Sequence, residues 1–544
     1  MSSVYIDPIV PGQAVLHKTQ STADYLNKNA FYYQVLPNGQ GNDFKYSGNN
    51  RIEFQVSSNS DMWDLSETHL SFNYTTTLTE GNAARQVSMR DQTRWMEGGA
   101  LNVIRNIQIA TTAGVVIENI QGYNKLRHII SCCNESPEFV DRVKCKRHDS
   151  MNEVYDMGYN GSELRPAILN AAAADRIGAF QDDLGVVSEQ WGIVPQPVED
   201  DYQVVNVANG VAVGGGDGLD TPADVATSLL FINRRVKKSV RADSAQNART
   251  AEQKVTLKLQ SGFFENKNWF PLLLTKGIVI TIELEQPEFC FTTGVNPQAA
   301  NGMSVDYTIY RPKLFCRMIT PTQSLVEQYV KAMKDNKLNY TFGTYDRVLY
   351  QNPAGSSGNI SFQLPVSRRS ISHTLTVVQN ARKNALDRTT GNLNSYNYGH
   401  RYLRANMTSI QWQQGSDLYP ISGPVEIDRY NARPMELLLT TFGKNGVEES
   451  MRFKPYEFQA RNVDSGNANE CHKLILGYRF SRDFSPFTGV DTSSGNFIQM
   501  NFVQSAAYQV NPGAGLANQP LYIYTYVGYD AIMSITNAGI IVRK

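Results

Sequence analysis

Five side chains of the kind that bind zinc lie within 21 residues of this 544-residue sequence. They follow the pattern His128-x3-Cys132-Cys133-x11-Cys145-x2-His148. Zinc takes four such ligands in a tetrahedron, and cysteine and histidine at these spacings can supply them. The stretch lacks a Cys-x2-Cys knuckle, however, and Cys133 falls on the apolar face of a predicted helix. We therefore favour buried free thiols over a metal centre and predict no metal-binding residue.

Two further motifs lie near the middle of the chain. The stretch "GGDGLD", Gly215 to Asp220, matches the start of one calcium-binding nonapeptide, a motif that works through many stacked copies. A single copy favours a flexible surface loop. The stretch "RRVKKSVR", Arg234 to Arg241, carries five positive charges in eight residues and could be a nuclear localisation signal or a genome-facing patch. We favour a solvated face or a subunit contact, which requires no special role.

The sequence offers little that could catalyse a reaction. It contains no Walker A pattern, no Gly-x-Ser-x-Gly elbow and no His-Glu-x-x-His motif, and it has only seven histidines. The acidic pairs Asp182-Asp183 and Asp200-Asp201 lie in predicted loops without a nearby base, as solvated turns do. We predict that the protein is not an enzyme and has no catalytic or cofactor-binding residue.

Composition and charge exclude several other classes. Lysine plus arginine equals aspartate plus glutamate at 51 each, so the formal net charge is zero. A protein whose main task is to bind nucleic acid usually has more basic than acidic residues, so we predict no sequence-specific nucleic-acid binding. A neutral chain also lacks the long-range repulsion that keeps copies apart. The sequence shows no secretory signal and no apolar window long enough to span a membrane, so we predict cytosolic synthesis with free thiols.

Alternating apolar and polar residues predict strands over most of the chain. In "TKGIVITIELEQPEF", Thr275 to Phe289, isoleucine and leucine occupy every second position, which indicates a strand with one buried face. A similar long strand, Leu521 to Ile535, occurs near the C-terminus. Helical spacing predicts helices in "YNKLRHIISCCNESPEFVDRV" from Tyr123 and in "SLVEQYVKAMKDN" from Ser324, with a further candidate in "PVEIDRYNARPMELLLTTF".

Each half of the chain supplies about eight such strands. We predict an all-β fold of two consecutive eight-stranded jelly-roll β-sandwiches with helical and loop insertions. The expected organisation is an extended N-terminal arm (1–45), a first jelly roll (46–291) with an insertion at about 123–253, a Gly/Asn/Pro-rich linker (292–304) and a second jelly roll (305–544).

Four phrases in this order carry a resemblance to a known family. They are "RIEFQVSSNSDMWDLSETHLSFNYT" (51–75), "SGFFENKNWFPLLLTKGIVITIELE" (261–285), "VDYTIYRPKLFCRMITP" (305–321) and "PLYIYTYVGYDAIMSITNAGIIV" (520–542). The chain resembles, over about residues 30–544, the double jelly-roll major capsid proteins of the adenovirus and tailless-phage lineage. Within that lineage it is most similar to those of virophages and polinton-like viruses.

The resemblance implies a function through assembly. Two upright sandwiches per subunit give six lobes in a homotrimer, and such a pseudo-hexagonal capsomer can tile an icosahedral shell around a double-stranded DNA genome. The implied partners are the chain itself, neighbouring trimers, and penton and minor capsid proteins, and the implied location is the virion capsid. It also implies that the arm, 1–45, becomes ordered only against neighbouring subunits.

Two alternatives stay open. The first is a carbohydrate-binding or glycan-processing β-sandwich protein, in which exposed tryptophans stack on sugars and paired carboxylates act on them. The five tryptophans that could do so are Trp63, Trp95, Trp191, Trp269 and Trp412. No carboxylate pair on adjacent strands stands out in support. The second is a tail or spike protein, although such chains usually show repeated fibre or β-helix periods.

Overall fold

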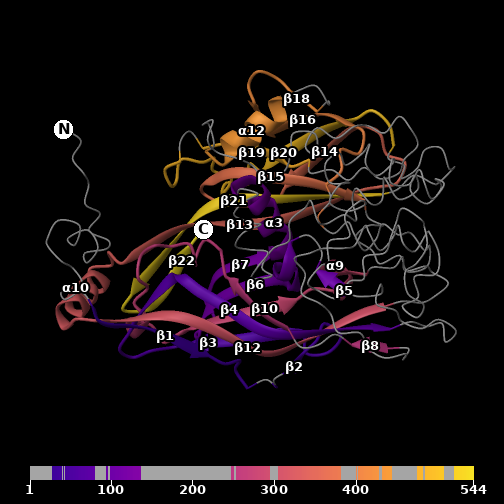
Figure 1. Ribbon diagram of the computed structural model, residues 1–544. Coiled ribbons are helices and arrows are strands. Elements are labelled where there is room, and N and C mark those ends of the chain that lie inside the picture. The colour runs from indigo at the N-terminus through magenta and orange to yellow at the C-terminus, as the bar shows by residue number, and fades with distance from the viewer. Residues whose placement is uncertain are drawn as a thin grey trace, which may run out of the picture.

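The protein consists of two antiparallel β-sandwiches that lie one above the other, with a short helix between them (Figure 1). The structure is a computed structural model, and most of its long strands lie along one common axis (Figure 1). It describes residues 27–39, 41, 43–79, 93–95, 98–135, 247–249, 253–293, 304–380, 400, 402–427, 432–443, 474–481, 484–507 and 520–544. Every strand pairing among these residues is antiparallel.

The first sandwich packs a six-stranded sheet against a four-stranded sheet. The six-stranded sheet contains β1 (Asn27–Val35), β2 (Asp43–Phe44), β4 (Met62–Thr79), β8 (Asn247–Arg249), β9 (Gln253–Lys258) and β12 (Ser304–Pro321). The four-stranded sheet has the order β3 (Arg51–Val56), β10 (Ile278–Leu284), β6 (Ile104–Thr111) and β7 (Val116–Gln121). A small ladder joins β5 (Thr93–Trp95) to β11 (Phe291–Thr293).

The second sandwich packs two five-stranded sheets together. One contains β13 (Asn339–Asn352), β15 (Ile371–Asn380), β19 (Leu476–Arg479), β21 (Leu521–Thr536) and β22 (Gly539–Arg543). The other contains β14 (Gly358–Leu364), β16 (Met407–Gln414), β17 (Asp417–Tyr419), β18 (Val425–Glu426) and β20 (Ile498–Gln504). Strands β13 to β16, and then β19 to β21, alternate between the two sheets, as the strands of a jelly roll do.

The predicted strand faces are confirmed. In β10, Ile278, Ile280 and Ile282 are fully buried between the sheets of the first sandwich, as their period of two requires. In β14, the apolar residues Ile360 and Phe362 are buried while their polar neighbours are exposed. The two sandwiches thus obtain their cores from the alternation that the sequence displays.

Three predicted helices are present, each with its apolar stripe against a sheet. They are α3 (Tyr123–Asn134), α10 (Gln323–Lys334) and α12 (Arg433–Thr441). A further turn, α9 (Pro287–Cys290), follows β10, and two 3-10 turns span Gly99–Val103 and Leu272–Leu274. Helix α3, the described start of the predicted insertion, lies at the junction between the sandwiches (Figure 1).

The predicted division at residues 292–304 does not follow the sheets. Strand β12 was expected to open the second jelly roll, but it pairs with β4 and β1 in the first sandwich. A Gly/Asn/Pro-rich segment is as typical of a loop within a domain as of a linker. We propose that the second unit begins after β12, with α10.

Part of the predicted N-terminal arm is a strand of the protein's own sheet. Strand β1, within residues 1–45, pairs with β12 of the same chain along nearly its whole length. The expectation that the arm becomes ordered only against neighbouring subunits is therefore wrong for these residues. Residues 1–26 of the arm lie outside the described part of the chain.

Candidate functional site: the junction of the sandwiches and an exposed edge strand

The two sandwiches are joined by buried hydrogen bonds between residues far apart in the sequence. The Tyr526 hydroxyl on β21 donates to the Gly122 carbonyl, just before α3, at 3.0 Å. The Tyr340 hydroxyl on β13 donates to the Trp269 carbonyl of the first sandwich at 2.9 Å. Burial raises the pKa of Tyr526 and Tyr340 well above the usual range, so both hydroxyls stay protonated and remain donors. These bonds fix the orientation of one sandwich relative to the other.

A backbone-to-backbone contact brings the sandwiches closest together. Gly262, in the loop after β9, lies against Gly343 of β13, and a Cβ added at Gly262 would stand 1.8 Å from the Gly343 carbonyl oxygen. No side chain can occupy that space without separating the two backbones. Glycine is therefore required at position 262 by close approach.

A fully buried carboxylate holds this loop in place. Glu118 on β7 accepts the backbone N–H groups of Gly262 and Phe263, each at 3.1 Å. Burial raises the pKa of Glu118, and the hydrogen bonds that it accepts oppose this rise. The carboxylate thus satisfies two buried donors at the point where the sandwiches touch.

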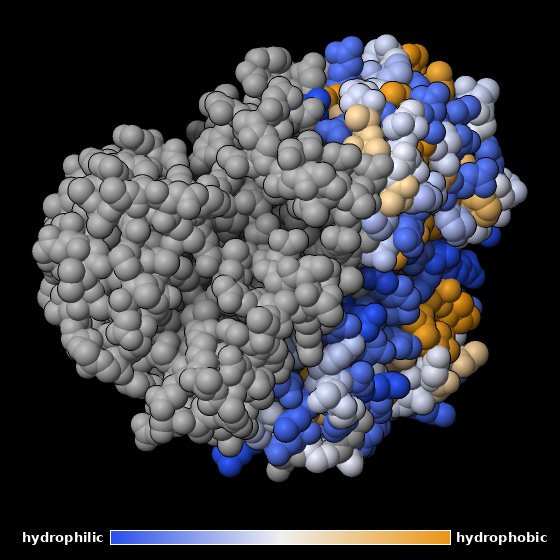
Figure 2. Space-filling model, turned by 90° about the vertical axis from the view of Figure 1, so that its right-hand side faces the viewer, coloured by the Kyte–Doolittle hydropathy of each residue, from blue (hydrophilic) through white to orange (hydrophobic). Residues whose placement is uncertain are grey.

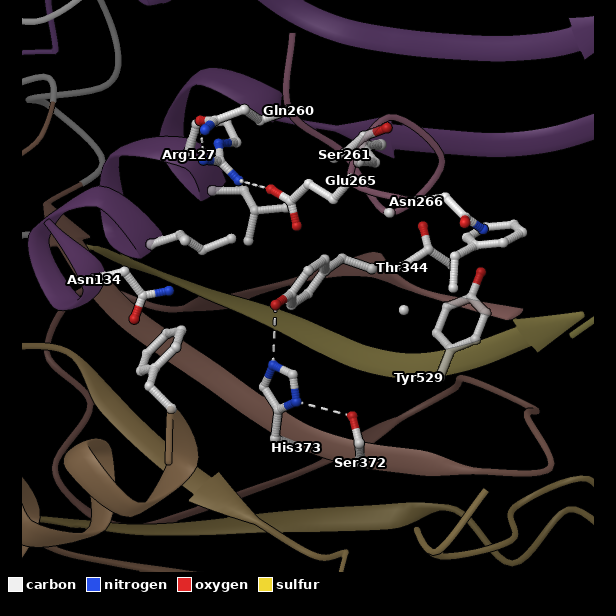
Figure 3. Close-up of a pocket in the computed structure, with 18 of the residues that line it drawn as sticks. Arg127, Asn134, Gln260, Ser261, Glu265, Asn266, Thr344, Ser372, His373 and Tyr529 are labelled. Atoms are coloured by element: carbon white, nitrogen blue, oxygen red, sulfur yellow. Dashed lines mark hydrogen bonds and ion pairs between the residues drawn. The ribbon is translucent and has the colours of Figure 1, made fainter. Parts of the chain in front are cut away.

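A cavity of about 1130 Å³ opens at the junction, between α3 and the sheet of β13, β15 and β21 (Figure 3). Its wall combines apolar side chains such as Leu126 and Phe442 with polar ones. Arg127 of α3 lies across the cavity from His373 and forms an ion pair with Glu265 at 3.3 Å. Positively charged, negatively charged and neutral polar side chains all line the cavity. The wall therefore does not favour a ligand of one particular charge.

A serine and a histidine meet in the cavity wall. The Ser372 hydroxyl lies 2.8 Å from His373 Nδ1 and donates to the Gly528 carbonyl at 3.1 Å, while His373 Nε2 lies 3.1 Å from the Tyr345 hydroxyl (Figure 3). A β-bulge at this point of β15 brings the two neighbours together. Burial first, and the Arg479 charge second, lower the pKa of His373 to about 4.

This pair suits a structural role better than catalysis. An imidazole with so low a pKa is a weak general base at neutral pH, and its hydrogen-bonding partners in the described part of the chain are the hydroxyls of Ser372 and Tyr345, not a carboxylate. The pair was not predicted from the sequence. Successive residues of a regular strand point to opposite faces, so Ser372 and His373 would not be expected to meet. Nothing in the sequence around Ser372 indicates the bulge that makes the exception.

The low pKa of His373 predicts an acid-dependent loss of stability. The unfolded chain binds a proton near pH 6.5, whereas the folded chain does so only near pH 4. Stability is therefore fully present above pH 6.5 and falls as the pH drops toward 4, by about 3 kcal/mol for this shift. We expect the free energy of unfolding of the variant His373→Gln, measured with denaturant between pH 4 and 7, to depend less on pH than that of the wild type. Equal slopes for wild type and variant would contradict the assignment.

The residues of the possible zinc pattern are only partly described. His128 stacks on His400 with ring centroids 4.2 Å apart, and its Nδ1 lies 2.9 Å from the Tyr402 hydroxyl. Cys132 and Cys133 are buried, and the Cys132 sulfur lies 3.6 Å from His128 Nε2. No group of three or more potential metal ligands occurs among the described residues. Cys145 and His148 lie outside them.

Three of the tryptophans considered for sugar stacking belong to the interior. Trp63, Trp95 and Trp412 are almost fully buried and therefore lack the face open to solvent that a sugar-binding platform requires. Trp269 is partly buried and packs against the core. Trp191 lies outside the described residues.

Three other predictions fall on residues that the structure does not describe: the "GGDGLD" loop (215–220), the basic stretch (234–241) and the acidic pairs at 182–183 and 200–201. Among the helices that it does describe, none is long and apolar enough to cross a membrane.

Strand β1 exposes aromatic side chains on both of its faces. Tyr32 is 59% exposed, Tyr33 46% and Phe31 37%, and Leu36 just beyond the strand is 60% exposed. The strand lies at the edge of its sheet, and no strand among the described residues pairs with its outer side. Exposed aromatics on an open edge strand are typical of a surface that another chain covers.

A second face also carries a hydrophobic group. Figure 2 shows the molecule from the right-hand side of Figure 1, and a small group of hydrophobic side chains lies near the right edge of that view, next to hydrophilic ones. Exposed hydrophobic groups of this kind are found at protein–protein contacts.

Comparison with solved structures identifies the fold. No family model matches the sequence, and no curated protein matches it. A chain from the structure of the Sputnik virophage is similar over 96% of this chain and 90% of its own length, with 13% identity and a TM-score of 0.58. The major capsid protein of mavirus is similar over 94% and 89%, with 10% identity and a TM-score of 0.50. At these identities the likeness concerns the fold, and it confirms the double jelly roll.

Proposed function

We propose that this chain is a major capsid protein that assembles into homotrimeric, pseudo-hexagonal capsomers, which tile an icosahedral shell around a double-stranded DNA genome. The observation that carries the proposal is the likeness of fold to virophage chains over almost the full length of both proteins. A likeness of this extent covers both sandwiches and the connection between them. The alternative of a sugar-binding protein has no comparable support.

The rigid junction supports this proposal physically. A trimer of two-lobed subunits imitates a hexagon only if the lobes of each subunit keep a fixed angle. The buried hydrogen bonds of Tyr526 and Tyr340, and the contact of Gly262 with Gly343, hold that angle by direct backbone and side-chain contact. Domains joined by a loose, wet interface would instead move relative to each other.

Strand β1 is the surface that we propose for contact between subunits. Its occupant is a second copy of this chain, because the chain has no net charge to repel its own copies and the strand offers both aromatic area and an open backbone edge. Aromatic side chains are also the residues that most often dominate binding energy at protein interfaces.

Charges placed on β1 should separate the subunits. We expect the double variant Tyr32→Lys/Tyr33→Lys to weaken self-association at least ~100-fold, since two interface aromatics together contribute about 3 kcal/mol or more. The fold should persist, because both side chains are about half exposed within one subunit. Sedimentation across a concentration series measures the change. The control Leu418→Lys/Ile421→Lys places the same charges on exposed residues of the second sandwich, and equal dissociation of both variants would refute the assignment to β1.

The remaining expectations follow from the same proposal. Neighbouring trimers, a penton protein at the fivefold vertices and minor capsid proteins would be the other partners. The protein would be made in the host cytoplasm and would end in the virion capsid. Sequence-specific contact with the genome is not expected from a neutral chain.

The mass of the purified chain tests the proposal. Light scattering should give a particle near three times the 60.8 kDa of one chain, which persists on heating. A monomer that binds an oligosaccharide panel would instead favour the sugar-binding alternative.

A further inference from the structure

A lysine and a glutamine from different sandwiches face each other at the junction. Lys125 of α3 places its Nζ 2.5 Å from the side-chain oxygen of Gln379, which lies on β15 of the second sandwich. Gln379 is only 2% exposed. The ring of Tyr524, on the neighbouring strand β21, lies 3.4 Å from the same nitrogen. An amine is thus held against the carbonyl of a buried amide.

The surroundings favour the reactive form of the amine. Burial, with the positive charge of Arg347 as a second cause, lowers the pKa of Lys125 to about 7, while Glu285 opposes this change. A substantial fraction of the side chain is therefore uncharged at neutral pH. An uncharged, desolvated lysine amine is a nucleophile, as in the lysines that enzymes use to attack carbonyl groups.

The charge of a buried carboxyl group, Glu285, acts on Lys125. Glu285, directly after β10, accepts a hydrogen bond from Asn124, the residue before Lys125, at 3.1 Å. Burial raises the pKa of Glu285, so it holds a proton to higher pH than an exposed glutamate. A protonated carboxyl can give its proton to a reacting amide and recover one from the attacking amine.

We propose that Lys125 and Gln379 form an intramolecular isopeptide bond that joins the two sandwiches covalently. The uncharged Nζ attacks the side-chain carbonyl carbon of Gln379 and forms a C–N bond. Glu285 supplies a proton to the departing amide nitrogen and accepts one from Nζ. The C–N bond of the primary amide breaks, and ammonia leaves. The products are a secondary amide and one ammonia molecule, with no oxidant, reductant or cofactor required.

The bond would link the two sandwiches covalently at their junction. It would connect residues 254 apart in the sequence, across the interface whose angle the junction fixes. A cross-link that closes so long a loop restricts the unfolded chain strongly. The inference concerns the chemistry of one chain and does not depend on the proposed capsid function.

Mass spectrometry of the intact, denatured full-length chain tests the proposal. After incubation at pH 8, we expect a mass lower than that of the sequence by one ammonia molecule. Tryptic digestion should then give a branched peptide in which residues 106–127 are joined to residues 370–382, because trypsin does not cleave after an acylated lysine. Wild-type chain with the full sequence mass, and with Lys125 and Gln379 in separate peptides, would overturn the proposal and leave a hydrogen bond only.

Variants assign the roles of the three residues. Lys125→Arg keeps the positive charge and removes the nucleophile, and Gln379→Met keeps the length and removes the carbonyl; both should retain the full sequence mass. Glu285→Gln should slow the loss of ammonia at least tenfold while leaving both reacting groups in place. An unchanged rate in Glu285→Gln would refute its role, and loss of ammonia in Lys125→Arg would refute this cross-link. If a variant fails to fold, the mass and the tryptic peptides of the wild-type chain still decide whether the cross-link forms.

Discussion

Replacing Gly262 with alanine is expected to destabilise the protein by about 4 kcal/mol or more and to prevent formation of the native two-sandwich unit. The new Cβ would stand 1.8 Å from the Gly343 carbonyl oxygen, and the next nearest atom is also backbone. Overpacking usually costs about 1–3 kcal/mol because side chains can shift, but here the backbones themselves must separate. That separation would also strain the hydrogen bonds that Glu118 accepts from the same loop.

The matched control lies on the other side of the same contact. Gly343→Ala adds the same atom to β13, where no atom lies within 4 Å of the added Cβ, so we expect a change within about 1 kcal/mol. Denaturant unfolding of both variants, with size-exclusion chromatography of the folded material, measures the difference. If the two substitutions prove equally mild, the close approach of the sandwiches at Gly262 is not as described.

Replacing Glu118 with alanine should have the second largest effect, about 4 kcal/mol. The substitution leaves the N–H groups of Gly262 and Phe263 without the acceptor that now binds both. Each buried donor left unsatisfied costs about 1–3 kcal/mol, and the lost side-chain volume adds a cavity. Amide hydrogen exchange of residues 261–264 should therefore accelerate more than that of the distant β14.

The comparison variant removes a glutamate of the same size from the surface. Glu53→Ala, on β3, breaks an exposed ion pair with Arg51 and should change stability by at most about 1 kcal/mol. A comparable loss in both variants would mean that Glu118 does not organise the junction.

Much of the fold was predictable because it rests on local patterns. The buried isoleucines of β10 and the apolar stripes of α3 and α10 follow directly from periods of two and of 3.6 residues. The double jelly roll itself was predicted from the number and spacing of such strands, together with four phrases that resemble a known family.

The junction was not predictable in the same way, because its contacts join distant residues. Nothing local to Gly262 indicates that Gly343 lies against it, and Lys125 meets Gln379 only after both sandwiches have formed. Strand β12 was assigned to the wrong sandwich because the Gly/Asn/Pro-rich segment before it was interpreted as a linker between domains. A loop within a domain has the same composition. Burial of Trp63 and Trp412 likewise depends on which sheet covers them.

We propose that one chain forms a rigid pair of sandwiches and that three such chains assemble into a six-lobed particle. Electron microscopy of the purified, unmodified oligomer tests this assembly. We expect class averages with six lobes arranged around a threefold axis in a nearly hexagonal outline. Single two-lobed particles at assembly concentrations, or lobes that vary in their mutual angle within one subunit, would contradict it.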